Sequence, residues 1–186
     1  MGKNVLIVSA SPRKGGNSDL LCLQFMMGAK AQGHQVEKVN LRETKIGYCL
    51  ACEHCRQHDG MCVQQDDMGG ILAKMVAADV IVMATPVYFY NMSGQMKTFI
   101  DRVYPVYPNI SDKDLYFIMT AADERKEAMD TALAGFRGFV SCLGEVSEKG
   151  VVFGTGVWKI GDIKGKTAMA QAYEMGKNVS SIASLK

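Results

Sequence analysis

Runs of consecutive apolar residues alternate along this chain with segments in which apolar residues recur every three or four positions. The runs 5–8, 80–84 and 115–119 lack the apolar–polar alternation of a half-exposed strand, which predicts strands buried on both faces. Further strands are expected at about 35–41 and 145–153. Helical spacing predicts helices after these strands, at about 18–31, 66–76, 92–103, 124–143 and 165–182.

Five strand–helix units in succession predict an α/β fold in which helices cover both faces of a parallel sheet. In the right-handed doubly wound arrangement, the five strands take the order 2-1-3-4-5 and form the middle of a three-layer sandwich. The 186 residues contain no repeat, linker or low-complexity segment. We therefore expect one domain over residues 1–186, with a cysteine-rich loop insertion at about 46–63.

Polar residues at two expected helix starts predict N-caps. Asn17 or Ser18 is suited to cap the first helix, and Asp66 the helix that follows the cysteine-rich insertion. Capping is a more common role than catalysis for an aspartate directly before a helical pattern.

Composition and charge restrict the classes of partner. Hydrophobic residues make up 48% of the chain and charged residues 22%, as in ordinary globular proteins. A net charge of +2, with no basic run interleaved with aromatics, argues against a nucleic-acid partner. No apolar stretch approaches the about 20 residues of a membrane span. Because the first strand begins without room for a secretory signal, we expect a cytoplasmic protein whose six cysteines are reduced, metal-bound or redox-active.

The connection after the first strand is rich in groups that bind anions. Hydroxyl and amide donors and two basic residues lie within ten positions, at Ser9, Ser11, Arg13, Lys14, Asn17 and Ser18. The connection also leads from the carboxyl end of a strand into a helix, whose free N–H groups and dipole favour an anion. We therefore predict a phosphate-binding loop.

The connections after strands one, three and four converge if the strand order is as predicted. The second of them, 85–91, contains Pro86, Val87, Tyr88, Phe89 and Asn91, which together suit a flat apolar ring with polar edges. The third runs from Thr120 to Asp123. A phosphate joined to a planar heteroaromatic ring describes flavin mononucleotide (FMN).

Other phosphate sites lack their required residues in this chain. The first connection contains neither GxxxxGK[ST] nor GxGxxG, and Gly154-Thr155-Gly156 lacks a third glycine. A phosphatase would need a cysteine nucleophile in the first connection, which has none. A phospho-acceptor signalling domain would need an aspartate where Thr85 and Pro86 stand. FMN is consistent with each of these comparisons.

Three segments are specific in combination: Ser9-Ala10-Ser11-Pro12-Arg13 with Asn17-Ser18, Thr85-Pro86-Val87-Tyr88-Phe89, and Met96-Lys97-Thr98-Phe99-Ile100-Asp101-Arg102. They span the first two-thirds of the chain, and together they resemble the flavodoxin-like superfamily of NADPH-dependent FMN reductases and iron–sulfur flavoproteins. The final third fits only in its strand–helix pattern.

The resemblance implies roles for particular residues. By it, the FMN phosphate is held by Ser9, Ser11, Arg13, Asn17 and Ser18. The isoalloxazine is lined by Pro86, Val87, Tyr88, Phe89 and Asn91, and its other edge is closed by Thr120, Ala121 and Asp123. Lys97, Asp101 and Arg102 are expected on a solvated or interface face rather than in catalysis.

Cys49, Cys52, Cys55 and Cys62 have the spacing C-x2-C-x2-C-x6-C. Three thiolates at that spacing can turn toward one centre, and the fourth completes a possible [4Fe–4S] ligand set. The pattern resembles the compact motif of iron–sulfur flavoproteins. Free thiols are an alternative, since FMN reductase-like relatives often carry similar cysteines. A zinc site is less consistent, because structural zinc sites usually pair two C-x2–4-C units across a longer gap.

Two functions are consistent with these features. The first is an FMN-dependent oxidoreductase that passes electrons from NAD(P)H to a small acceptor such as a quinone, a nitro- or azo-compound or free flavin. The alternative is an electron carrier with FMN and a [4Fe–4S] cluster that serves ferredoxin-like partners. Flavodoxin-type carriers use a strongly negative surface, so the net charge of +2 favours the enzyme.

Two further expectations concern catalysis and assembly. No residue is identified as a catalytic acid or base, because the flavin would carry the chemistry. Aromatic residues at 88–90, 104 and 107 lead us to expect a homodimer or homotetramer.

Overall fold

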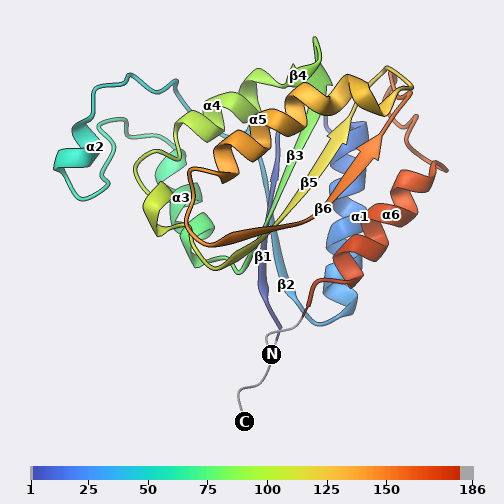
Figure 1. Ribbon diagram of the computed structural model, residues 1–186, viewed down its shortest axis with the longest axis horizontal. Coiled ribbons are helices and arrows are strands. Elements are labelled where there is room, and N and C mark those ends of the chain that lie inside the picture. The colour runs from blue at the N-terminus through green and yellow to red at the C-terminus, as the bar shows by residue number, and fades with distance from the viewer. Residues whose placement is uncertain (1, 181–186) are drawn as a thin grey trace.

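Five parallel strands form the centre of the molecule (Figure 1). The computed structural model describes residues 2–180. The parallel strands are β1 (Asn4–Ser9), β2 (Gln35–Asn40), β3 (Val80–Tyr88), β5 (Lys113–Thr120) and β6 (Val146–Gly154). They lie in the order β2-β1-β3-β5-β6, which confirms the predicted flavodoxin-like order 2-1-3-4-5 for the parallel strands.

Helices cover both faces of this sheet and form the outer layers of a sandwich (Figure 1). One face is covered by α1 (Asn17–Ala31) and α6 (Thr167–Lys177), with Leu21, Phe25 and Ala172 in the core between helices and strands. The other face is covered by α3 (Met68–Ala77), α4 (Gly94–Asp101) and α5 (Asp130–Val140). The three layers are those predicted from the apolar runs.

Helices α1 and α6 approach each other unusually closely, at two glycines. A Cβ atom at Gly28 would lie 2.0 Å from the carbonyl oxygen of Tyr173, and one at Gly176 would lie 2.0 Å from that of Phe25. Any side chain at either position would therefore force the two helices apart.

A sixth strand, β4 (Asn91–Met92), was not predicted. It pairs antiparallel with the end of β3, so the segment 85–91, which the sequence suggested was a loop, is largely a hairpin. Phe89 and Tyr90 form its turn with φ of 49° and 63°. Left-handed backbone at both turn positions is typical of a two-residue hairpin turn, but such turns usually carry Asn or Gly there. The sequence therefore contains no turn signal.

Both predicted N-caps are wrong. The cap of α1 is Gly16, one residue before the predicted positions, and no side chain caps this helix. The cap residue of α3 is Asp67. The Asp66 carboxylate does accept a hydrogen bond from the Met68 N–H, but it is mainly engaged with another helix, as described below.

Two predicted helices are also too long. Helix α5 starts at Asp130 rather than near 124, because a 3-10 turn (Lys126–Met129) precedes it and the Asp123 carboxylate folds back onto the N–H of Arg125. Helix α6 ends at Lys177, and the last predicted positions, 181 and 182, lie outside the described residues. Within 2–180, none of the helices combines the length and hydrophobicity of a membrane span.

The cysteine-rich segment lies between a 3-10 turn (Leu41–Glu43) and α3, and it contains a short helix, α2 (His54–Gln57). It projects from one side of the sandwich, at the left of Figure 1. A further 3-10 turn (Tyr107–Asn109) precedes β5.

Candidate functional site

Four connections meet above the carboxyl end of the sheet and line a cavity of about 130 Å³. Three of them are those predicted to converge, after β1, β3 and β5. The fourth, between β6 and α6, was not included in the predicted site. The lining residues are Ser11, Arg13, Gly16, Asn17, Ser18, Pro86, Val87, Tyr88, Thr120, Ala122, Val157 and Trp158.

The wall of the cavity next to α1 has the features of an anion site. Ser18 is 1% exposed, and its Oγ has no hydrogen-bond partner among the described residues. It lies in the first turn of α1, where no side chain caps the backbone N–H groups. A Cβ atom at Gly16 would lie 2.6 Å from Ser11 Oγ, so the loop needs glycine there. A buried, unpaired hydroxyl beside an uncapped helix end fits a phosphate group.

Two of the predicted phosphate ligands also hold the β6–α6 connection in place. The Asn17 side chain donates to the carbonyl oxygen of Lys159 at 2.9 Å and accepts from the N–H of Ile163 at 3.2 Å. The Arg13 guanidinium donates to the carbonyl oxygen of Trp158 at 2.8 Å. The phosphate loop and the β6–α6 connection are therefore one unit.

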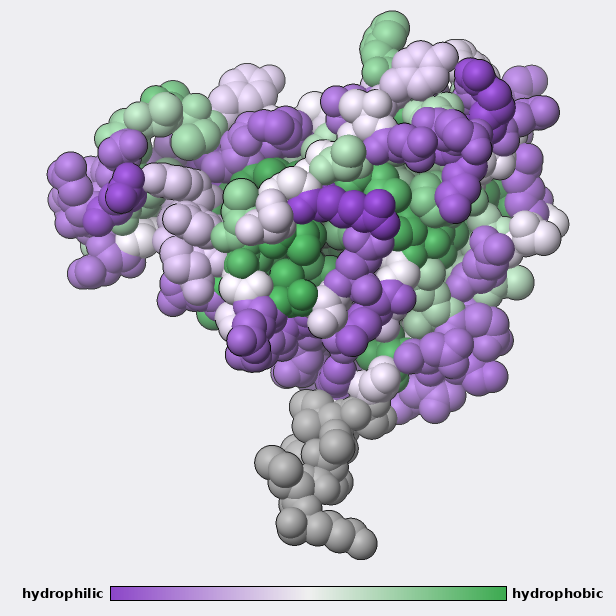
Figure 2. Space-filling model, in the orientation of Figure 1, coloured by the Kyte–Doolittle hydropathy of each residue, from purple (hydrophilic) through white to green (hydrophobic). Residues whose placement is uncertain are grey.

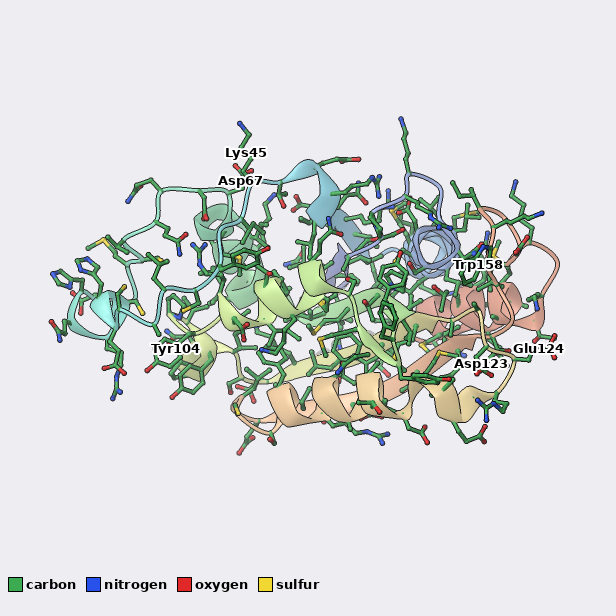
Figure 3. The ribbon with its side chains drawn as sticks, turned by 90° about the horizontal axis from the view of Figure 1, so that it is seen from above. Lys45, Asp67, Tyr104, Asp123, Glu124 and Trp158 are labelled. Carbon is green, nitrogen blue, oxygen red and sulfur yellow. The ribbon has the colours of Figure 1, made fainter. Side chains whose placement is uncertain are left out.

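Trp158 is the cavity residue that sequence reasoning missed. It is 72% exposed and borders the cavity, and Figure 3 shows it at the same end of the molecule as Asp123 and Glu124. Its N–H donates to the Asp162 carboxylate at 2.9 Å, which shapes the loop locally. The sequence did contain a sign of this residue's role, because its only tryptophan lies among the loop glycines 154, 156 and 161.

Two predicted site residues lie beneath the cavity rather than in its lining. Ser9 is fully buried at the end of β1, where its hydroxyl faces Cys22 of α1. Burial raises the pKa of Cys22 to about 12, so this thiol is a neutral packing group. Ala121 is buried, and its N–H donates to the carbonyl oxygen of Gly154.

Three other predicted site residues lie outside the cavity lining. Phe89 is fully exposed at the tip of the β3–β4 hairpin, and Asn91 binds its own strand through the N–H of Met92. The Asp123 carboxylate pairs with Arg125 at 2.9 Å. Hydrogen bonds from Arg125 lower the pKa of Asp123 to about 2, so this carboxylate is ionised at neutral pH. The assignment of these residues to a cofactor site stays a prediction.

The hairpin tip forms an exposed aromatic surface next to the cavity. Tyr88 is 44% exposed and Tyr90 57%, beside the fully exposed Phe89. Figure 2 shows hydrophobic atoms projecting at the top of the molecule, where Figure 1 has the β3–β4 turn. Such a surface is suited to a protein contact, and the homodimer or homotetramer stays a prediction.

The cysteine segment lines a second cavity, of about 470 Å³. Figure 3 shows this segment at the opposite end of the molecule from Trp158. All four cysteines of the motif line the cavity, together with Asp101, Arg102 and Tyr104. Ala51 and Glu53 have φ of 51° and 53°, a conformation unusual for residues other than glycine, so the chain turns sharply between the cysteines.

The four thiols surround the cavity without converging on one point. In the described part of the chain, no three His, Cys, Asp or Glu side chains are placed to bind a single metal ion. The thiolates that hold a [4Fe–4S] cluster need not converge on one point, because each thiolate binds a different iron. Burial raises the pKa of Cys55, and the thiols of Cys62, Cys49 and Cys52 raise it further. Four thiols around one cavity fit a cluster better than a single zinc ion.

Arg102 is not on a solvated or interface face, and that expectation is wrong. It is 2% exposed, and its guanidinium forms two hydrogen bonds to Asp66, at 2.7 and 2.9 Å. The partner lies 36 residues away, so the local helical pattern gave no sign of the pair. Lys97 and Asp101 of the same helix are exposed and pair with each other at 2.7 Å, as expected for a solvated face.

Comparisons with known proteins agree with this geometry. The family model for NADPH-dependent FMN reductases matches residues 3–139. An iron–sulfur flavoprotein of Archaeoglobus fulgidus is 40% identical over 98 residues, which are 53% of this chain and 44% of that protein. The chain thus spans about half the length of the curated iron–sulfur flavoproteins it matches.

Two further relatives match over most of the chain. The Bacillus subtilis protein YwqN, to which an NAD(P)H-dependent oxidoreductase activity with FMN is ascribed, is 28% identical over 82% of this chain and 84% of its own. An NAD(P)H:quinone oxidoreductase from Methanothermobacter marburgensis has the same fold, with a TM-score of 0.80, 16% identity and coverage of 98% of both chains.

Proposed function

The chain belongs to the NADPH-dependent FMN reductase family, and on that premise we propose that it is an FMN-dependent oxidoreductase that passes electrons from NAD(P)H to a small acceptor. The observation that carries the proposal is the unpaired hydroxyl of Ser18, buried beside the uncapped end of α1. Ser11 and Arg13 complete the polar side of that cavity.

The volume of the cavity indicates which end of FMN it takes. At about 130 Å³ it is smaller than the several hundred Å³ of a typical ligand pocket. It therefore suits the phosphate and the neighbouring ribityl chain. The ring would extend from the cavity toward its open side, past the lining residues Pro86, Val87 and Tyr88. When bound, FMN supplies hydride acceptance from a nicotinamide and electron transfer onward.

The chain's own residues would bind and orient the cofactor rather than transfer protons. Val87, Tyr88 and Trp158 offer apolar and aromatic surface at the rim. Asp123 is paired with Arg125 and ionised, so it is unsuited to act as a general acid. The acceptor would approach from the open side, where Tyr88 and Trp158 border the mouth of the cavity.

Turnover with different acceptors tests this function. The FMN-loaded protein should oxidise NADPH or NADH with a quinone, a nitro- or azo-aromatic compound or free flavin, because small planar acceptors can reach an open rim. The measurement is steady-state loss of the nicotinamide absorbance. Turnover with ferredoxin and with none of the small acceptors would contradict the enzyme and favour an electron carrier.

A second candidate function is an electron carrier with a [4Fe–4S] cluster in the cysteine segment. The observation that favours it is the second cavity, which is lined by Cys49, Cys52, Cys55 and Cys62 together. In that case FMN and the cluster would lie at opposite ends of the molecule in the view of Figure 3. The partners would be ferredoxin-like proteins.

Removing one thiol tests the cluster. Cys52→Ala should abolish the iron and sulfide content and the broad iron–sulfur absorbance of anaerobically reconstituted protein, because a [4Fe–4S] cluster needs four ligands. Cys142→Ala is the matched control, since Cys142 is exposed and lies outside the cavity. Wild-type protein with flavin absorbance and no iron would contradict the cluster and leave the enzyme proposal standing.

A further inference from the structure

The base of the cysteine segment is closed by contacts between its two ends. The Lys45 N–H donates to the Asp67 carboxylate at 2.7 Å, and the Asp67 N–H donates to the Lys45 carbonyl at 3.1 Å; Figure 3 shows both residues where the segment leaves the sandwich. The Gln64 side chain also donates to the carbonyl oxygen of Tyr48 at 2.9 Å. Residues 48–63 therefore form a loop, and these contacts hold together the two chain segments at its base, which we call the stem.

Arg102 fastens this stem to α4. Its guanidinium donates to the Gly47 carbonyl at 2.8 Å on one side of the stem and to the Asp66 carboxylate on the other. Asp66 in turn accepts from the N–H groups of Gly47 and Met68. The hydrogen bonds from Arg102 hold the pKa of Asp66 below its ordinary value, so the pair is ionised at neutral pH.

The Arg102 guanidinium also reaches the second cavity, which the four cysteines line. Its Nη2 lies 3.6 Å from Cys62 Sγ, within the range of a hydrogen bond to sulfur. Its Nε is buried and has no partner among the residues that the structure describes. A buried donor normally finds a partner, and Arg102 lines the cavity with the four cysteines. The guanidinium thus forms part of the cavity wall, beside the Cys62 thiol.

We propose that Arg102 is a positioning residue for the cysteine loop, which holds the stem closed, hydrogen-bonds Cys62 and raises the reduction potential of a cluster bound there. The last part rests on the second candidate function. Hydrogen bonds to the sulfurs of a cluster stabilise its more negative, reduced state, and they are among the factors that set its potential. Residues that orient metal ligands also affect metal affinity.

Amide hydrogen exchange tests the stem without any cluster. In Arg102→Gln and Arg102→Lys, peptides covering 44–50 and 60–68 should exchange at least tenfold faster than in wild type, because neither side chain can bridge Gly47, Asp66 and Cys62. Lys97→Gln is the control, since it removes an exposed charge from the same helix. Unchanged exchange would overturn the proposal. Loss of protection across the whole sheet in both variants would also overturn it, because Arg102 would then stabilise the fold in general and not the stem in particular.

The reduction potential tests the contact with sulfur. After anaerobic reconstitution with ferrous iron and sulfide, Arg102→Gln should shift the potential to a more negative value than wild type, with a smaller shift for Arg102→Lys. Iron retention against a chelator should fall by about tenfold to a hundredfold. Equal potentials in all three proteins would overturn this part. Wild-type protein that takes up no iron would overturn it together with the carrier function, while FMN content and NAD(P)H turnover report separately on the enzyme.

Discussion

Replacing Ser18 with aspartate abolishes FMN binding if the cavity beside α1 holds the cofactor phosphate. The side chain of Ser18 is buried and its hydroxyl has no protein partner, so a carboxylate there would face the phosphate directly. Like charges placed together in a buried site cost several kcal/mol, which corresponds to a loss of affinity of about a thousandfold or more. The measurement is a titration with FMN, monitored by quenching of the fluorescence of Trp158, the only tryptophan in the sequence.

A milder variant and a control separate binding from folding. Ser18→Ala removes one hydrogen bond to a charged group, worth about 1.5–3 kcal/mol, so affinity should fall by about tenfold to a hundredfold. Ser180→Asp places the same charge on an exposed serine and should bind FMN like wild type. Normal FMN affinity in Ser18→Asp would show that the phosphate lies elsewhere.

Alanine at Gly28 or Gly176 destabilises the fold, although alanine is the better helix former. Each Cβ would lie 2.0 Å from a backbone carbonyl of the other helix, and backbone cannot move aside as a flexible side chain can. Overpacking of this kind costs about 3 kcal/mol. For a chain of this length, the expected fall in melting temperature is roughly 6–12 °C, measured by thermal unfolding of each variant.

Gly138→Ala is the matched control for these two variants. Gly138 lies in α5, and a Cβ there would meet no atom within 4 Å. The substitution should therefore stabilise the protein by about 0.5–1 kcal/mol through helix propensity alone. If all three variants shift the melting temperature in the same direction, close packing of α1 against α6 is not what requires glycine.

The features predicted correctly from the sequence are those that local patterns determine. Buried parallel strands are read from unbroken apolar runs such as 80–84, and their order follows from the handedness of strand–helix–strand units. The convergence of the connections after β1, β3 and β5 follows from that order. The cavity lining at Ser11, Ser18 and Tyr88 was therefore accessible from the sequence.

The features that were missed depend on partners distant in the sequence. Asn17 was expected to cap α1, but its amide binds a loop more than 140 residues away. Arg102 has the spacing of an exposed helix position, yet Asp66 and Gly47 draw it into the interior. The turn of the β3–β4 hairpin uses two aromatic residues in left-handed conformation, which no turn preference predicts.

The central claim is that this chain binds FMN and reduces it with a nicotinamide cofactor. The most direct test is anaerobic mixing of the FMN-loaded protein with NADPH or NADH while the visible absorbance of the flavin is recorded. FMN should stay with the protein through gel filtration, and its absorbance should be lost at a rate that saturates with nucleotide. Protein that retains no FMN after reconstitution, or whose bound FMN keeps its absorbance with both nucleotides, would contradict the claim.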